Sequence, residues 1–447
     1  MFRNNHITPA FILVFLVFVF LIGVSFLPSD LSIFGIEIKP VDLFSELKQN
    51  DDELNYTFTS LEDSEDVNEN IKLNLDDLVN VITEPIEENN NGGGLSKFYT
   101  KLRELQKGTN IRIAYFGDSM IEGDLFSKDL RSYLQKKFGG SGIGFVPITD
   151  NNAGSWATIN IQFSDNFLNY SVIHKKPAGY NYGINGYVYL TDTTNTVDST
   201  GKVKDFWVEY SGKNFVNAKL FFTSYSDTAY ITYTINNKTT KQYLGKNLSI
   251  GISEIKSINS SKIKINFYGK LALYGVSFEN EPGIFVDNYA VRGHSGLNLT
   301  RIPKSVLQAF NSYFDYNLII LQYGANVLDE SVHSYGWYKE GLVKTIKYLQ
   351  NAFPDASILV VSAADRSRKD LNGFSTIKNV FSLIDAQESA AKETGAAFWN
   401  LFKAMGGVNS MPVWVEGNMA SPDYTHFNHS GSSALSKKLT LSLLKNL

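Results

Sequence analysis

The distribution of apolar and polar residues along the chain shows four different patterns. Residues 10–27 are almost continuously apolar, and residues 30–94 are polar and acidic. In residues 95–150 and 281–447, short apolar runs alternate with segments whose apolar residues recur at helical spacing. Residues 151–280 instead alternate apolar and polar positions between turn residues. The last two patterns are typical of an α/β domain and of antiparallel strands, respectively.

The alternation of apolar runs and helical segments predicts a parallel sheet covered by helices on both faces. We expect strands at residues 111–116, 283–290, 317–322, 357–362 and 396–401, and helices at residues 95–105, 124–138, 297–310, 338–353, 376–393 and 430–444. These elements lie on both sides of residues 151–280. The sequence therefore predicts one α/β domain, made of residues 95–150 and 281–447, that is interrupted by an insert.

The insert, residues 151–280, consists of short alternating segments separated by Asn, Gly, Asp and Ser. Few helical patterns occur in it, which favours an antiparallel β-sandwich, such as a jelly roll. It also contains many aromatic residues, Trp156 and Trp207 among them. Such rings stack on sugars in some proteins, but they more often pack in cores or in cross-strand pairs. Carbohydrate binding by the insert is therefore a hypothesis.

The apolar run at residues 10–27 is long enough to cross a bilayer as a helix. Arg3 precedes it and Asp30 follows it, an asymmetry that directs the remaining chain outward. No clear small-residue cleavage site follows, so residues 1–29 are expected to be an uncleaved membrane anchor rather than a removed signal peptide. We expect residues 30–94 to form an acidic tether that holds an exported catalytic part on the periplasmic or extracellular side of the inner (cytoplasmic) membrane.

The composition of the chain limits the chemistry it can perform. The formal net charge of −4 gives no electrostatic reason to expect a nucleic-acid partner. The chain has no cysteine, which excludes disulfides, thiolate nucleophiles and thiolate metal sites. A nucleophile must therefore come from another residue type, and six histidines are available as bases.

A candidate nucleophile follows the first strand of the predicted sheet. Gly117-Asp118-Ser119 comes directly after a run of apolar residues, which places the serine at the carboxyl edge of the sheet, where open α/β sheets bind ligands. Serine is a poor nucleophile until a base removes its proton. The alternative interpretation is a turn in which Asp118 and Ser119 cap the next helix.

A candidate base lies in the loop before the last helix. Asp423 and His426 are separated by two residues, so the carboxylate can meet the ring on one tight turn and hold it in one tautomer. His429 competes for the same role, but Asp423 is better spaced for His426. Gly293 and Asn326 follow two further strands, where a glycine N–H and an amide can stabilise negative charge on oxygen. Both are also ordinary turn residues.

Together these residues resemble the blocks of the SGNH (GDSL-type) hydrolase superfamily. The blocks Gly117-Asp118-Ser119, Gly293, Gly324-Ala325-Asn326 and Asp423-x-x-His426 occur in the expected order. The resemblance implies a flavodoxin-like three-layer α/β/α fold, here interrupted by the β-sandwich and preceded by the predicted transmembrane helix. It also implies that Ser119 is the nucleophile, His426 the base and Asp423 its orienting partner, with an oxyanion hole made by Ser119, Gly293 and Asn326. No metal or organic cofactor is implied.

The β-rich insert in an exported chain is similar to one subgroup, the bacterial peptidoglycan O-acetylesterases with an inserted carbohydrate-binding-like module. This resemblance implies a serine acetylesterase that acts on an O-acetylated cell-envelope glycan through an acetyl-serine intermediate. One alternative is a glycan O-acetyltransferase that uses the same triad and passes the acetyl group to a sugar. The other is a non-catalytic protein that binds envelope glycan.

Overall fold

The computed structural model describes residues 32–33, 36–37, 84–88, 93–106, 108–150, 156–191, 204–371, 373–445 and 447. The chain divides into an N-terminal unit, residues 1–80, and a larger unit, residues 81–447. In the N-terminal unit, β1 (Ser32–Ile33) pairs antiparallel with β2 (Ile36–Glu37). The predicted membrane anchor at residues 10–27 lies outside the described residues. Among the residues that are described, no helix has the length and apolar content needed to span a bilayer.

The larger unit is built on a mixed sheet. Its strands lie in the order β16 (Ile284–Ala290), β4 (Ile111–Gly117), β17 (Tyr316–Gln322), β18 (Ser357–Val361), β21 (Ala397–Trp399) and β3 (Ile86–Glu87). The strands from β16 to β21 are parallel, in the 2-1-3-4-5 order of flavodoxin-like folds. Every residue of β4, β17 and β18 is buried, which explains their continuous apolar runs.

Strand β3 pairs antiparallel with β21 at one edge of this sheet. It lies within residues 30–94, the segment expected to be a tether. Ile86 is buried in the core although its neighbours are acidic and polar. The α/β domain therefore begins before residue 95, because one isolated apolar residue is enough to anchor a short edge strand.

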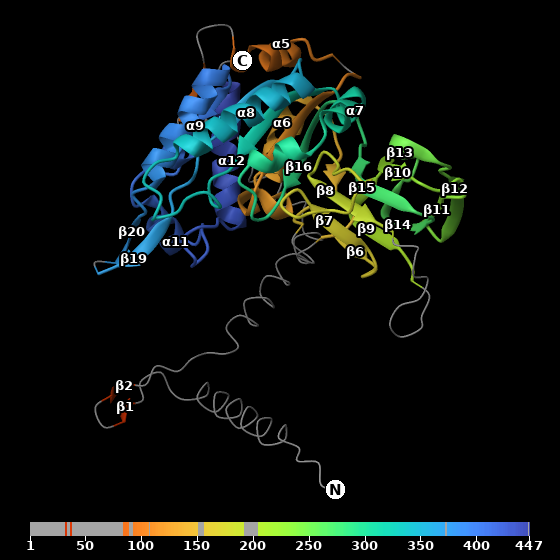
Figure 1. Ribbon diagram of the computed structural model, residues 1–447, viewed down its shortest axis with the longest axis horizontal. Helices are drawn as coiled ribbons and strands as arrows, with labels where there is room; N and C mark the ends of the chain where they lie inside the picture. Colours follow the sequence, from red (N-terminus) through yellow and green to blue (C-terminus); the bar gives the residue numbers. More distant parts are fainter. Residues whose placement is uncertain are drawn as a thin grey trace. The chain divides into compact units, whose positions relative to one another are not determined.

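Helices cover both faces of the sheet, which gives the expected three layers (Figure 1). The helices α5 (Ser96–Arg103), α6 (Ser127–Phe138) and α12 (His429–Leu444) contribute to one core. The helices α7 (Lys304–Phe314), α8 (Gly336–Ala352) and α9 (Val380–Thr394) contribute to the other. Successive residues of β4 alternate between the two cores: Ile113 and Tyr115 face the first, and Ala114 and Phe116 face the second.

The insert is an antiparallel β-sandwich, as expected. One sheet has the order β13 (Asn247–Ile255), β10 (Ala218–Ser224), β15 (Leu271–Phe278), β8 (Tyr187–Leu190) and β7 (Leu168–Ser171), with β5 (Gly144–Val146) also on β15. The other sheet has the order β12 (Lys238–Tyr243), β11 (Tyr230–Ile235), β14 (Ser260–Tyr268), β9 (Trp207–Phe215) and β6 (Ile159–Phe163). Because β5 pairs with β15, the sandwich starts at Gly144 rather than at residue 151.

The sheet that contains β15 is buried on both faces. One face packs on the other sheet of the sandwich, and the opposite face packs on the α/β domain beside α7 and β16 (Figure 1). Phe221 of β10 lies with its ring centroid 5.1 Å from that of Phe310 and 4.9 Å from that of Phe314, both in α7. The insert is therefore joined to the α/β domain through a shared apolar core.

A buried ionic network crosses the same junction. Arg112 of β4 donates to Asp287 of β16 at 2.6 Å and to Glu279 at 2.7 Å. Asp287 also accepts hydrogen bonds from the Tyr316 hydroxyl at 2.6 Å and from the N–H of Phe145, in β5, at 2.8 Å. Burial on its own raises the pKa of Glu279, but Arg112 and a neighbouring lysine outweigh it and lower that pKa to about 2. The network thus links three elements of the α/β sheet to the insert.

Candidate active site

Ser119 lies at the carboxyl edge of the central sheet. Gly117, the last residue of β4, pairs with Ala290 of β16 on one side and with Gln322 of β17 on the other. The chain then enters a 3₁₀ segment, η1 (Ser119–Asp124), and the Asp118 side chain caps it by accepting a hydrogen bond from the Met120 N–H at 3.0 Å. Asp118 therefore caps the next helical segment, as the alternative interpretation predicted, and this does not prevent Ser119 from being the nucleophile.

A chain of two hydrogen bonds joins Ser119 to the loop before α12. The Ser119 Oγ lies 2.9 Å from Nε2 of His426, and Nδ1 of His426 lies 2.6 Å from Oδ2 of Asp423. The Asp423 side chain is 48% exposed and the His426 side chain 36% exposed. Burial on its own raises the pKa of Asp423, but hydrogen bonds from the His426 ring and backbone outweigh it and lower that pKa. The carboxylate is thus ionised and holds the ring with Nε2 toward the serine.

The loop that carries Asp423 and His426 is held by its own backbone and by a neighbouring hairpin. Oδ1 of Asp423 accepts the His426 N–H at 3.0 Å, and the Ser421 N–H donates to the His426 carbonyl at 2.8 Å. Tyr424 has a φ of +56°, and its ring stacks on Phe374 with a centroid distance of 3.5 Å. Phe374 belongs to a hairpin of β19 (Ser367–Asp370) and β20 (Gly373–Thr376) that the sequence pattern did not predict. The Ser367 N–H of the hairpin also donates to the Tyr424 carbonyl at 3.2 Å, so the hairpin helps to fix the loop.

Gly293 and Asn326 follow the two strands that flank β4. Gly293 has a φ of +77°, which suits glycine in the turn after β16. The Asn326 side chain donates to the carbonyl of His294 at 3.4 Å, which connects the turn after β17 to the turn after β16. Both expected oxyanion residues therefore lie at the sheet edge that carries Ser119, on opposite sides of β4.

Two buried titratable groups, Asp118 and His294, lie beside these residues. Asp118 is fully buried; burial raises its pKa to about 6, although the hydrogen bond from Met120 lowers it in part. His294 is also fully buried, which lowers its pKa to about 4 and leaves the ring uncharged at neutral pH. Their positions next to Ser119 and Gly293 were visible in the sequence, but their burial was not.

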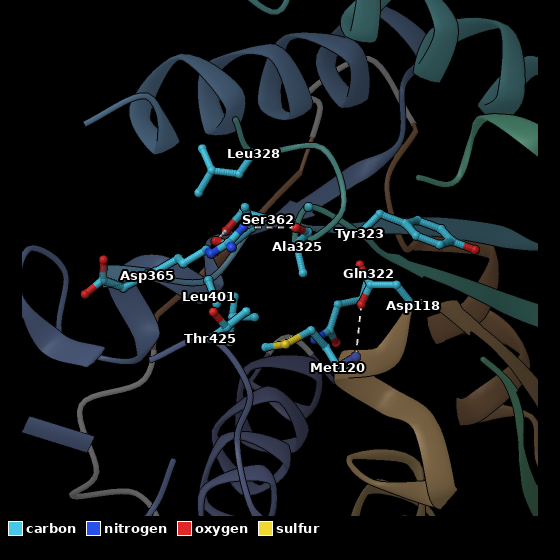
Figure 2. A pocket seen from close by; sticks show the side chains of 14 residues that line it. Asp118, Met120, Gln322, Tyr323, Ala325, Leu328, Ser362, Asp365, Leu401 and Thr425 are labelled. Carbon is cyan, nitrogen blue, oxygen red and sulfur yellow. Dashed lines mark hydrogen bonds between the residues drawn. The ribbon is translucent and has the colours of Figure 1, made fainter. Parts of the chain in front are cut away.

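A pocket opens next to Ser119 at the ends of β4, β17 and β18 (Figure 2). Asp118 and Met120, the chain neighbours of Ser119, line one side, and Thr425, the neighbour of His426, lines another. Much of the remaining wall consists of small or apolar side chains: Ala325, Leu328, Ala363, Ala364 and Leu401. The pocket is therefore narrow, mostly apolar and adjacent to the hydrogen-bonded serine.

In the part of the chain that the structure describes, no three or more His, Asp or Glu side chains are grouped so that they can hold a metal ion. The site itself contains a hydroxyl, an imidazole, a carboxylate and an amide, the set used in acyl transfer through a serine.

The fold can be compared with those of solved structures. The structure of a peptidoglycan O-acetylesterase superposes with a TM-score of 0.64 and 20% sequence identity, over 81% of this chain and 98% of that one. A family two carbohydrate esterase from Cellvibrio japonicus aligns with a TM-score of 0.26 and 10% identity, over 68% of this chain and 98% of that one. No family model and no curated protein matches the sequence. The first likeness confirms the predicted fold, an α/β domain with an additional β domain.

Proposed function

We propose that this protein is a serine esterase that removes O-acetyl groups from a cell-envelope glycan, namely peptidoglycan. The observation that carries the proposal is the hydrogen-bonded series Ser119, His426 and Asp423 at the sheet edge, next to a narrow apolar pocket. A serine hydroxyl within reach of an oriented imidazole is the arrangement needed for nucleophilic acyl transfer.

In the first half of the reaction, Ser119 Oγ attacks the acetyl carbonyl carbon while His426 Nε2 takes the serine proton. Negative charge develops on the carbonyl oxygen and is stabilised by the N–H groups of Ser119 and Gly293 and by the Asn326 amide. The bond between the carbonyl carbon and the sugar oxygen then breaks. His426 gives its proton to the departing sugar oxygen, and the acetyl group remains on Ser119.

In the second half, a water molecule takes the place of the sugar. His426 removes a proton from this water, which attacks the acetyl carbon of the acyl-enzyme. The bond to Ser119 Oγ breaks, the proton returns from His426 to the serine, and acetic acid leaves and gives its remaining proton to solvent to form acetate. Asp423 stays ionised throughout and stabilises the charged ring.

Three observations support the substrate. The pocket next to Ser119 is small, and most of its exposed surface is apolar, although polar side chains such as Gln322 and Ser362 also line it; this suits the methyl group of an acetyl ester and leaves little room for a long acyl chain. A solved structure with the same fold is that of a peptidoglycan O-acetylesterase. The apolar run at residues 10–27 predicts export to the side of the membrane where peptidoglycan lies.

The exposure of the triad favours hydrolysis over acetyl transfer. About half of the Asp423 side chain and a third of the His426 side chain are in contact with solvent. An acetyltransferase has to keep water away from its acyl-enzyme. Open access to His426 instead allows water to be activated directly.

The proposal is tested by trapping the intermediate. The full chain is mixed with O-acetylated peptidoglycan and quenched in acid, released acetate is measured, and the peptide that contains residue 119 is analysed by mass spectrometry. We expect acetate release and the mass of one acetyl group on Ser119. A purified, folded protein that releases no acetate from this polymer or from 4-nitrophenyl acetate contradicts the proposal.

Replacing Asp423 by asparagine is expected to lower kcat/KM for acetate release roughly 100-fold. An amide can still accept the backbone N–H groups of Thr425 and His426, so the loop stays folded, but it no longer stabilises the charged ring. The loss is smaller than that of a fully buried triad carboxylate because Asp423 is half-exposed and water screens its charge. Steady-state kinetics check this; activity within threefold of the wild type contradicts the assigned role.

A further inference from the structure

A second cleft lies between the α/β domain and the insert. Its walls include Glu122 and Ala290 from the α/β domain and Thr149, Asp150, Trp156 and Tyr187 from the insert side. We propose that this cleft binds an uncharged sugar unit of the glycan, next to the unit whose acetyl ester reacts at Ser119. The inference rests on the proposed esterase function and extends it to the substrate's neighbouring residue.

The cleft is adjacent to the nucleophile. Glu122 lies in η1, the segment that begins with Ser119, and Ala290 is the last residue of β16, three positions before Gly293. The pocket beside Asp118 and Met120 involves β17 and β18, whereas the cleft involves β16 and the insert. The two therefore lie on opposite sides of β4 in the strand order, with Ser119 between them. When the acetyl group of one sugar lies in the pocket, the neighbouring sugar of the same glycan can lie in the cleft.

Hydrogen bonds tie the segment that carries Trp156 to the segment that carries Ser119. The N–H of Ala157, directly after Trp156, donates to the Gly123 carbonyl at 2.9 Å. The Thr158 hydroxyl donates to the carboxylate of Asp124, the last residue of η1, at 2.7 Å. Trp156 is thus held at a defined position relative to the nucleophile, and little ordering is needed when a ligand binds.

The lining combines aromatic surfaces with fixed polar groups, as sugar sites require. Trp156 and Tyr187 are half-buried, and the ring of Tyr187 stacks on that of Tyr189 at 5.9 Å, which fixes its orientation. The buried Asn185 side chain accepts the Tyr187 N–H at 3.2 Å and donates to the Tyr274 carbonyl at 3.0 Å. These contacts make the aromatic wall rigid, and a rigid aromatic face can pack against the C–H face of a sugar ring.

The charges of the cleft select an uncharged unit. Its two acidic side chains are Glu122 and the buried Asp150. Arg292, which is not among the lining residues, donates to the Glu122 carboxylate from its Nε at 3.0 Å, so the charges of these two side chains partly neutralise each other. Among the described residues that line the cleft, no Lys, Arg or His accompanies these carboxylates, so the lining repels a carboxylate on the ligand and accepts uncharged hydroxyl and N-acetyl groups more readily. The cleft therefore fits an N-acetylhexosamine better than a sugar acid.

The test compares a polymer with a small ester. Replacing Trp156 by alanine is expected to lower about tenfold the ratio of kcat/KM for O-acetylated peptidoglycan to kcat/KM for 4-nitrophenyl acetate. Trp156→Phe, which keeps an aromatic face, is expected to restore most of the ratio. The matched control is Trp207→Ala, because Trp207 lies in β9, outside the cleft, with the Lys264 ammonium 4.1 Å from its ring centroid. This control is expected to keep the wild-type ratio.

Binding without turnover gives a second readout. A tetrasaccharide of alternating N-acetylglucosamine and N-acetylmuramic acid without acetyl esters is titrated into Ser119→Ala protein by calorimetry. Adding Trp156→Ala is expected to raise Kd about tenfold, and adding Trp207→Ala to leave it within twofold. If Ser119→Ala is inactive but Trp156→Ala changes neither the ratio nor Kd, the cleft is not a sugar site and the esterase proposal stands. If Ser119→Ala still releases acetate, the proposed function itself fails.

Discussion

Replacing Ser119 by alanine is expected to lower kcat for acetate release by roughly 10⁴-fold or more. In the proposed mechanism the Ser119 Oγ bonds to the acetyl carbon, and its removal leaves His426 with water as the remaining nucleophile. The residual rate comes from the donors at Gly293 and Asn326, which still stabilise charge on the ester oxygen. Acetate release from O-acetylated peptidoglycan measures the effect, with a thermal unfolding curve to establish that the variant is folded.

The matched control for this prediction is Ser312→Ala. Ser312 is an exposed serine of α7 whose hydroxyl donates to the Ala309 carbonyl within the same helix. Its removal is expected to leave kcat and KM within twofold of the wild type. A Ser119→Ala protein that keeps more than about a tenth of the wild-type rate would show that the hydrolysis does not proceed through this hydroxyl.

Replacing Asp287 by alanine is expected to lower the free energy of unfolding by about 3–5 kcal/mol. Asp287 is fully buried and Arg112 is 3% exposed, so the substitution leaves a guanidinium in the interior with Glu279 as its remaining anionic partner. The Tyr316 hydroxyl and the Phe145 N–H lose their acceptor as well. Urea unfolding, followed by circular dichroism, measures the change.

Two comparisons separate the buried pair from general effects of charge. The double variant Arg112→Met, Asp287→Leu leaves no unpaired guanidinium. Its free energy of unfolding is therefore expected to fall less than that of Asp287→Ala. Glu254→Ala breaks the exposed pair between Lys256 and Glu254, 2.8 Å apart, and is expected to leave the unfolding midpoint unchanged. A double variant less stable than Asp287→Ala would contradict this explanation.

Much of the α/β domain could be predicted because its strands and helices have different apolar periods. The strands at residues 317–322 and 357–362 lie within one residue of β17 and β18. The residues of the site could be found because each follows a strand end or lies in the last loop. Their placement together follows from the parallel sheet, since the carboxyl ends of parallel strands meet at one edge.

The remaining features depend on contacts between distant residues. Arg112 is a charged residue in an apolar strand, which signals a buried partner, but Asp287 is 175 positions away and nothing local identifies it. Strand β5 is three residues long and has no periodicity of its own, so the true start of the insert was missed. The cleft around Trp156 forms where the α/β domain and the insert meet. The residue pattern of a single segment does not predict such a contact.

Because one sheet of the insert is covered on both faces, the insert cannot be removed from the α/β domain without exposing apolar surface. A module attached through a flexible linker can be gained or lost by recombination without harm to its host. Deleting the insert would expose Tyr289, Phe310 and Phe314 to solvent, because they lie in the core that the insert and the α/β domain share. An exposed apolar patch of this kind promotes aggregation. The α/β domain and the sandwich are therefore expected to fold as one unit, and chimeras that exchange the sandwich for a foreign one need a redesigned junction.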